Sequence, residues 1–118
     1  MTTKNQDFVM RSGDTKKIDV VVDEKDSSGA VIGQVNLSGG SIVWKALDTL
    51  GAIRITKTTA AGITLLDAVN GKFEISLDPA DTGDLEGRFS HEAQLTDSSG
   101  NVTTVMAGVM TVEKDLVV

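Results

Sequence analysis

The sequence predicts an all-β sandwich of about seven to nine short antiparallel strands. Three observations support this fold class. Apolar and polar residues alternate along most segments, turn signals separate those segments at short intervals, and no segment keeps a helical period for long. A chain of 118 residues can bury one hydrophobic core without disulfides. We therefore expect residues 1–118 to form a single sandwich domain.

Four segments alternate most clearly, and each predicts a strand with one buried and one exposed face. They are residues 15–24, 41–47, 72–78 and 88–96. Three of the four methionines fall in other strand-like segments, where flexible apolar side chains fill a core. The residues expected inside are Ile18, Val20, Val22, Ile42, Trp44, Ala46, Phe73, Ile75, Leu77, Phe89, His91, Ala93 and Leu95, with Met10, Met106 and Met110.

Glycine-containing turns separate the predicted strands. The sequence DSSG occurs at 26–29 and again at 97–100, and its glycine can adopt the positive φ that such turns need. The stretch AVNGKF at 68–73 predicts a two-residue Asn-Gly hairpin. These turns place neighbouring strands antiparallel to one another.

One segment, 77–87, breaks the alternation. Pro79, followed by Asp81 and Thr82, predicts one short helical turn near residues 79–84. Leu85 can then fill the core beneath that turn. No other segment shows a sustained period of 3.6 residues.

The composition argues against nucleic-acid and membrane partners. The chain has a formal net charge of −6 and no continuous basic stripe, so phosphate backbones would repel it. Aromatic residues make up only 3% of the chain, which leaves little for stacking on bases. No apolar run approaches the roughly 20 residues that span a bilayer, and the polar start MTTKNQDF lacks the apolar core of a signal peptide.

His91 is the candidate for acid–base catalysis, because it is the single histidine and has Glu92 beside it. Alternation places these two side chains on opposite faces of one strand, so they cannot form a catalytic pair there. Ser98 and Ser99 lie in the turn beyond the strand, and the chain contains no cysteine and no G-x-S-x-G elbow. We expect a core or rim histidine bonded to a backbone carbonyl or a hydroxyl, and a protein that is not an enzyme.

Two acidic clusters are candidates for calcium, which binds six to eight oxygen ligands. Neither has the EF-hand spacing, and Asp81 has a simpler role as a cap for the helical turn. We therefore favour ordinary solvated turns and assign no catalytic, cofactor-binding or metal-ligating residue and no cofactor. The clusters are Asp23, Glu24 and Asp26, and Asp78, Asp81 and Asp84.

The predicted position of Trp44, buried on an early-middle strand, favours the immunoglobulin-like version of the sandwich, here without its disulfide. Phe89 stands where such domains carry a corner tyrosine, whose hydroxyl it lacks. In order and spacing, several stretches resemble the immunoglobulin-like domain of tailed-bacteriophage virion proteins. The resemblance includes the N-terminal module of phage upper-baseplate proteins and small stand-alone phage structural proteins. These stretches are FVMRSGDT (8–15), IDVVV (18–22), LSGGSIVWK (37–45), GKFEISLDPADT (71–82), LEGRFSHEAQLTD (85–97) and TVMAGVMTV (104–112).

This resemblance implies a structural component of a virion, with no catalytic residues to carry over. The expected role is capsid decoration, a head–tail junction or a tail or baseplate position, after assembly in the host cytoplasm. Partners would be other virion proteins, including copies of the chain itself in a symmetric oligomer. The alternative function is a carbohydrate- or calcium-binding module of a host-recognition protein.

Candidate contact elements are the two ends of the chain, residues 1–6 and 115–118 as flexible or docking termini. More narrowly, they are Thr2–Asp7 and Asp115–Val118, where Leu116, Val117 and Val118 form an apolar end. The competing interpretation is that a terminal segment completes a sheet of its own sandwich.

Overall fold

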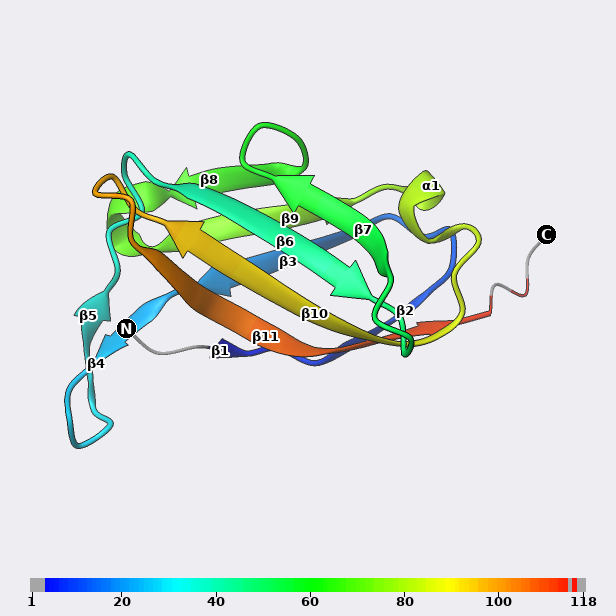
Figure 1. Cartoon of the computed structure of the whole chain (residues 1–118), viewed down its shortest axis with the longest axis horizontal. Coiled ribbons are helices and arrows are strands. Elements are labelled where there is room, and N and C mark those ends of the chain that lie inside the picture. The colour runs from blue at the N-terminus through cyan, green and yellow to red at the C-terminus, as the bar shows by residue number, and fades with distance from the viewer. Residues whose placement is uncertain (1–3, 115, 117–118) are drawn as a thin grey trace.

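The computed structural model describes residues 4–114 and residue 116, and Figure 1 shows that the fold is built almost entirely of β-strands. The described residues form eleven strands, one single-turn helix and one 3₁₀ turn. The bounds are β1 (Lys4–Asn5), β2 (Phe8–Arg11), β3 (Lys16–Val21), β4 (Asp23–Lys25), β5 (Val31–Gln34), β6 (Ser41–Leu47), β7 (Ile53–Thr58), β8 (Ile63–Asp67), η1 (Ala68–Asn70), β9 (Lys72–Leu77), α1 (Pro79–Thr82), β10 (Gly87–Thr96) and β11 (Val102–Glu113).

The strands form two packed layers, which confirms the all-β sandwich. The larger sheet has the order β1–β11–β10–β6–β7, with β2 also paired to β11, and the smaller has the order β3–β9–β8. Figure 1 shows the larger sheet in front of the smaller one. A separate two-stranded sheet, β4–β5, extends away from the body of the sandwich. Within the described residues, no helix is long and apolar enough to cross a membrane.

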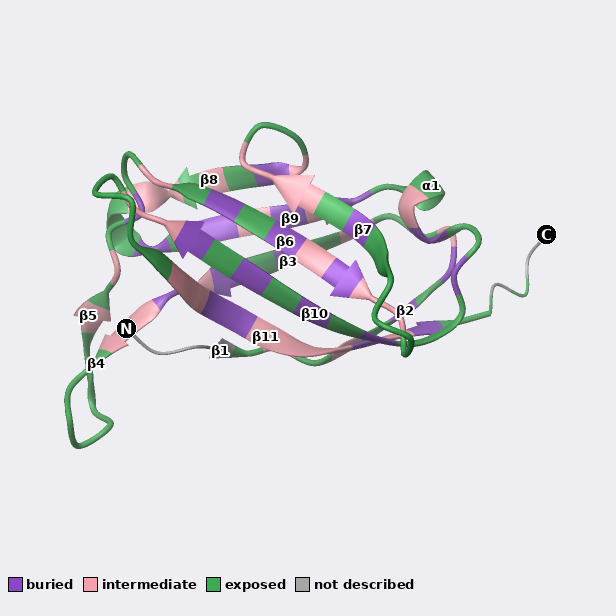
Figure 2. Cartoon of the chain, in the orientation of Figure 1, coloured by how far each residue is buried: buried purple, intermediate pink, exposed green. Residues whose placement is uncertain are grey.

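The predicted alternation is confirmed along the central strands. Figure 2 shows buried and exposed residues alternating along β6 and β10. Leu85 is buried beneath α1, as expected for the segment that follows the helical turn. All of the predicted core residues are buried: Met10, Ile18, Val20, Val22, Ile42, Trp44, Ala46, Phe73, Ile75, Leu77, Phe89, His91, Ala93, Leu95, Met106 and Met110.

The strand count and the pairing of the N-terminal strands differ from the prediction. Eleven strands replace the expected seven to nine, and β1 and β2 pair with β11 in parallel rather than antiparallel fashion. The backbone pairing with β11 is interrupted between β1 and β2, because there the side chain of Asp7 takes the place of a backbone carbonyl. Its Oδ1 accepts the Val109 N–H at 2.8 Å. Gly108 permits this close approach, since a Cβ there would collide with the Gln6 carbonyl.

The hairpin between β8 and β9 is antiparallel as predicted, but its turn is not a two-residue Asn-Gly turn. The 3₁₀ turn η1 comes first, and Gly71 alone takes the left-handed conformation, with φ 73°. The Asn70 amide donates instead to Asp67 Oδ2 at 2.9 Å, which holds the longer loop together. A local interaction of a short polar side chain therefore replaces the turn that the dipeptide predicts.

The helical turn forms where it was expected, as α1. The Asp78 N–H donates to Asp81 Oδ2 at 2.7 Å, so Asp81 caps the turn. Thr82 is fully buried, and its hydroxyl accepts the Gly13 N–H at 3.0 Å. Lys57 on β7 forms an ion pair with Asp81 at 2.7 Å, which ties α1 to the edge of the larger sheet.

Candidate functional site

His91 lies inside the sandwich, with 2% of its surface exposed. Its Nδ1 accepts the indole N–H of Trp44 at 3.1 Å, so its Nε2 carries the proton and donates to the Gln6 carbonyl. The predicted bond to a backbone carbonyl is therefore confirmed, and Glu92 points to the exposed face as expected. Both ring nitrogens are used within the fold.

The position of His91 explains how the N-terminal strands are held. Gln6 lies between β1 and β2, and the ring of Phe8 contacts the imidazole edge-on, with 5.2 Å between ring centroids. Burial lowers the pKa of His91, while the bond to Gln6 and the charge of Asp7 act in the opposite direction. The neutral imidazole thus joins Trp44 on β6 to the N-terminal edge of the same sheet.

Protonation of His91 is expected to destabilise the fold. Because its pKa is lower in the folded protein than the ordinary value of 6.5, the unfolded chain binds more protons below that pH. The free energy of unfolding should therefore be at its plateau above about pH 6.5 and fall as the pH drops towards the folded pKa. Urea titrations at pH 7.5 and 5.5 measure this difference. The His91→Gln variant should show a smaller decrease over this interval, and an equal decrease would contradict the assignment.

The two acidic clusters are not gathered around a common point: Asp23 and Glu24 lie on strand β4, and Asp26 begins the turn that follows it. Asp26 Oδ1 accepts bonds from the Ser28 N–H at 2.9 Å, the Ser28 hydroxyl at 2.7 Å and the Ala30 N–H at 3.1 Å. Asp78 and Asp81 belong to the capped turn of α1. In the part of the chain that the structure describes, no three His, Cys, Asp or Glu side chains form a group that could hold a metal ion.

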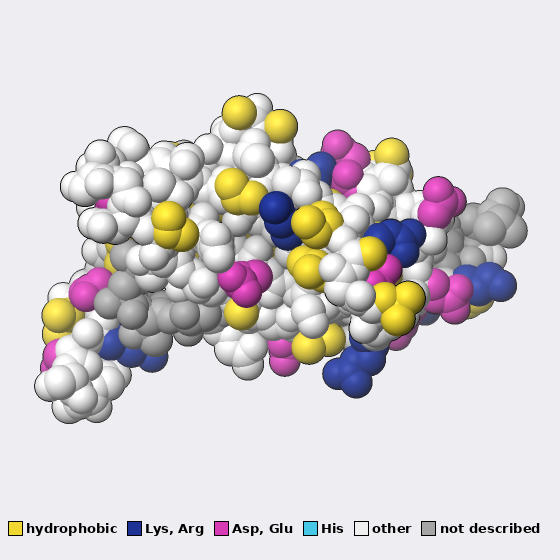
Figure 3. Space-filling model, in the orientation of Figure 1, with side chains coloured by type: hydrophobic (Ala, Val, Ile, Leu, Met, Phe, Trp, Pro, Cys, Tyr) yellow, Lys and Arg dark blue, Asp and Glu magenta, His cyan; other side chains and the backbone are white. Residues whose placement is uncertain are grey.

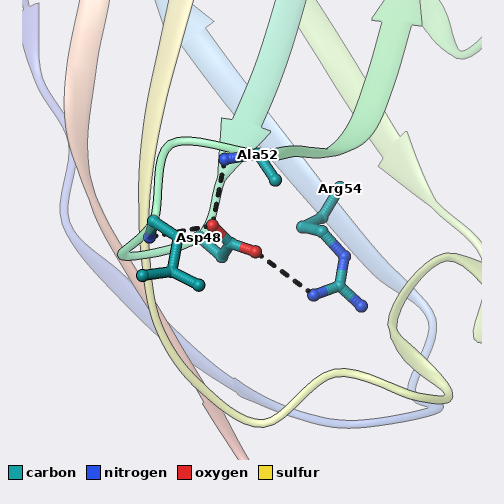
Figure 4. A network of polar contacts seen from close by, with 4 residues as sticks. Asp48, Ala52 and Arg54 are labelled. Atoms are coloured by element: carbon teal, nitrogen blue, oxygen red, sulfur yellow. Dashed lines mark hydrogen bonds and ion pairs between the residues drawn. The ribbon is translucent and has the colours of Figure 1, made fainter.

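The Asp26 turn is one of three turns in which an Asp side chain accepts backbone N–H groups from the residues two and four positions later. The sequence DSSG occurs at only two of them. Asp48, between β6 and β7, accepts the N–H groups of Leu50 and Ala52, and Asp97, between β10 and β11, accepts those of Ser99 and Asn101. Figure 4 shows the Asp48 turn, where Arg54 also contacts the carboxylate at 3.4 Å. The shared pattern is D-x-x-G-x, which the sequence DTLGA at 48–52 also fits.

Acid is expected to weaken the Asp48 turn. Backbone hydrogen bonds, chiefly from Ala52, lower the pKa of Asp48 below its ordinary 3.8, so its contribution to stability is present above that pH. The contribution is lost as the pH falls through the folded pKa. Asp48→Asn should therefore be less stable than the wild type at pH 6, with the difference shrinking towards pH 3 in thermal unfolding experiments. Thr49→Ala leaves the carboxylate in place and should keep the wild-type dependence on acid.

The predicted contact elements at the chain ends have different outcomes. Residues 4 and 5 form β1, and the Gln6 N–H donates to the Ala107 carbonyl at 2.9 Å, so this segment completes the chain's own sheet. Residues 1–3, Asp115, Val117 and Val118 lie outside the described residues. Leu116 is exposed, and its predicted role as a contact residue stays a prediction.

The β4–β5 hairpin is a projecting element with exposed apolar residues that the sequence analysis did not single out. Figure 1 shows it projecting from one end of the sandwich, and Val31 and Ile32 at the start of β5 are 54% and 64% exposed. Its root is tied to the body, because the Val22 N–H donates to the Gly71 carbonyl and the Val35 N–H to the Val22 carbonyl, each at 2.9 Å. The sequence feature that could have indicated this exposed site is the pair of successive apolar residues, Val31 and Ile32, close after the DSSG turn.

The outer face of the larger sheet is the other open surface. It contains a hollow of about 430 Å³ over β6 and β10, and Figure 3 shows this face with apolar side chains spread over it and charged side chains near its middle. Trp44 is absent from this face because it is fully buried, so it offers no aromatic platform for a sugar. The residues that line the hollow are Val43, Lys45, Leu47, Glu92 and Gln94.

Comparisons with known proteins found similar solved structures but no sequence relative. No family model matches the chain, and no curated protein matches its sequence. The fold is similar to the crystal structure of CopC from Methylosinus trichosporium OB3b, with 13% sequence identity and a TM-score of 0.46, over 100% of this chain and 90% of that one. A similarity at this level carries no argument about function.

Proposed function

We propose that the chain is a non-enzymatic docking module of a tailed-bacteriophage virion. The observation that carries the proposal is the projecting β4–β5 hairpin with the exposed apolar residues Val31 and Ile32. Exposed neighbouring apolar side chains on a projecting element are typical of protein contact sites. The immunoglobulin-like resemblance at the sequence level supplies the virion as the setting.

The hairpin suits docking by strand addition. Among the described strands, β5 pairs only with β4, so its other edge has backbone groups that are open to a further strand. A two-stranded hairpin has little stability of its own and gains from a third strand. A neighbouring virion protein can supply that strand, with pockets for Val31 and Ile32 giving specificity.

Purified particles test the virion assignment directly. Mass spectrometry of virions from the phage that encodes the chain should detect it at a fixed ratio to the major structural proteins, and electron microscopy should place it at a symmetric position. Its absence from purified particles would overturn the proposal.

A variant pair tests the role of the hairpin. Val31→Asp together with Ile32→Asp should prevent incorporation when the variant chain is supplied during assembly, while circular dichroism shows an intact fold. Leu50→Asp is the matched control, because Leu50 is 92% exposed in the turn between β6 and β7, away from the hairpin. Incorporation of the double variant at the wild-type level would show that the hairpin is not the docking element.

A further inference from the structure

The outer face of the larger sheet combines exposed apolar residues with a central pair of opposite charges. Val43 on β6, Ile53 on β7 and Val102 on β11 are all exposed. Between them, Lys45 on β6 lies directly opposite Glu92 on β10 in the strand register. Both line the hollow of about 430 Å³.

The carboxylate of Glu92 is held in a defined orientation. Its Oε1 accepts the Gln94 side-chain amide at 3.1 Å and the Thr104 hydroxyl at 3.2 Å. Gln94 lies on β10 itself, and Thr104 lies on β11, the neighbour of β10 on the side away from Lys45. The fixed negative charge therefore presents a defined target to a cation that approaches this face.

We propose that this face is the interface between two copies of the chain. A two-fold axis that lies in the interface and runs along the strands, between β6 and β10, brings Lys45 of one copy opposite Glu92 of the other, and makes the reverse pair at the same time. A positive and a negative residue side by side across such an axis are self-complementary, as an isologous interface requires. This arrangement of charges favours a second copy over an unrelated partner, which would need its own matching pair.

The shape of the face fits the same occupant. Sheets pack face to face about 10 Å apart with strands within about 30° of alignment, and medium-sized and long side chains fill such a space. The long side chain of Lys45 from the second copy can enter the hollow and reach Glu92. A stable interface buries about 800 Å² on each partner, and the molecule, with its projecting hairpin, measures 46 × 30 Å along its two longer axes.

Charge reversal tests the interface in the isolated chain, whatever the outcome of the virion assignment. Sedimentation equilibrium should show a wild-type dimer. Lys45→Glu and Glu92→Lys should each raise the dissociation constant at least about tenfold, since each places like charges across the axis. The double variant, which carries both changes, should recover the dimer because it restores opposite charges.

Mixing separates the proposed contact from an effect within one chain. In an equimolar mixture of the two single variants, residue 45 and residue 92 of different copies carry opposite charges at both contacts, so a heterodimer should form. If the single variants lost the dimer because of like charges within one chain, those charges would still be present after mixing, and no dimer would form. Lys17→Glu is the matched control: Lys17 pairs with Glu74 at 3.9 Å on the smaller sheet, and its reversal should leave the dimer unchanged.

Three results would overturn the proposal. They are a wild-type chain that stays monomeric at millimolar concentration, single variants that dimerise as tightly as the wild type, and monomeric single variants that do not associate when mixed. Circular dichroism of each variant confirms that the loss of the dimer is not a loss of fold.

Discussion

Replacing Trp44 by alanine is expected to lower the free energy of unfolding by about 3–5 kcal/mol, the range for removing a large buried aromatic side chain. Trp44 is fully buried on the central strand β6, so the substitution leaves a cavity between the two sheets. It also removes the N–H that donates to His91 Nδ1, which leaves a buried acceptor without its partner.

One further variant separates the loss of volume from the loss of the hydrogen bond, and another is a control. Both are measured in guanidinium titrations followed by circular dichroism. Trp44→Phe keeps most of the apolar volume and removes the N–H, so its loss should be smaller than that of Trp44→Ala. Val9→Ala, at an exposed position on β2, should change stability by no more than about 0.5 kcal/mol. A Trp44→Ala loss as small as that of Val9→Ala would contradict the central role of this side chain.

Gly71→Ala is expected to cost at least about 2 kcal/mol, from backbone strain and steric overlap together. Gly71 has φ 73°, and a Cβ there would lie 2.8 Å from the carbonyl oxygens of both Val22 and Val35. Those two carbonyls belong to the root of the β4–β5 hairpin, so the overlap cannot be relieved by rotating a side chain. The substitution should therefore loosen the hairpin as well as destabilise the sandwich.

Gly29→Ala is the matched control, because it measures the cost of backbone strain at a positive φ without steric overlap. Gly29 has a similar φ of 87°, but nothing lies within 4 Å of the position that its Cβ would take. Its alanine variant should show the left-handed penalty of about 1–2 kcal/mol and no steric part. Thermal unfolding of both variants gives the comparison, and equal losses would show that the contacts with Val22 and Val35 are unimportant. Hydrogen exchange of the hairpin amides then locates the loosening expected of Gly71→Ala.

The core was predictable from sequence because it depends on a local period. A strand exposes alternate residues to opposite sides, so the positions of Trp44, Phe73 and Phe89 follow from their neighbours alone. The opposite placement of His91 and Glu92 follows in the same way. These local patterns identified which side chains are buried without requiring knowledge of which strands pair.

The remaining features depend on contacts between distant segments. Nothing near residue 6 indicates that its carbonyl meets the residue-91 imidazole or that β1 runs parallel to β11. The projection of the β4–β5 hairpin results from an interruption at Val22, whose N–H bonds to Gly71 far along the chain. The Lys45–Glu92 juxtaposition likewise needs the register of β6 against β10. Residues separated by 40 or more positions set each of these features.

The bond from Trp44 to His91 also gives the molecule an internal optical probe. The chain contains one tryptophan, so its ultraviolet fluorescence comes from a single known site. That indole donates to the imidazole that in turn holds Gln6 at the N-terminal edge. A change in emission on mild acidification would therefore report on this one linkage in unlabelled protein, and stopped-flow mixing could time its opening separately from global unfolding.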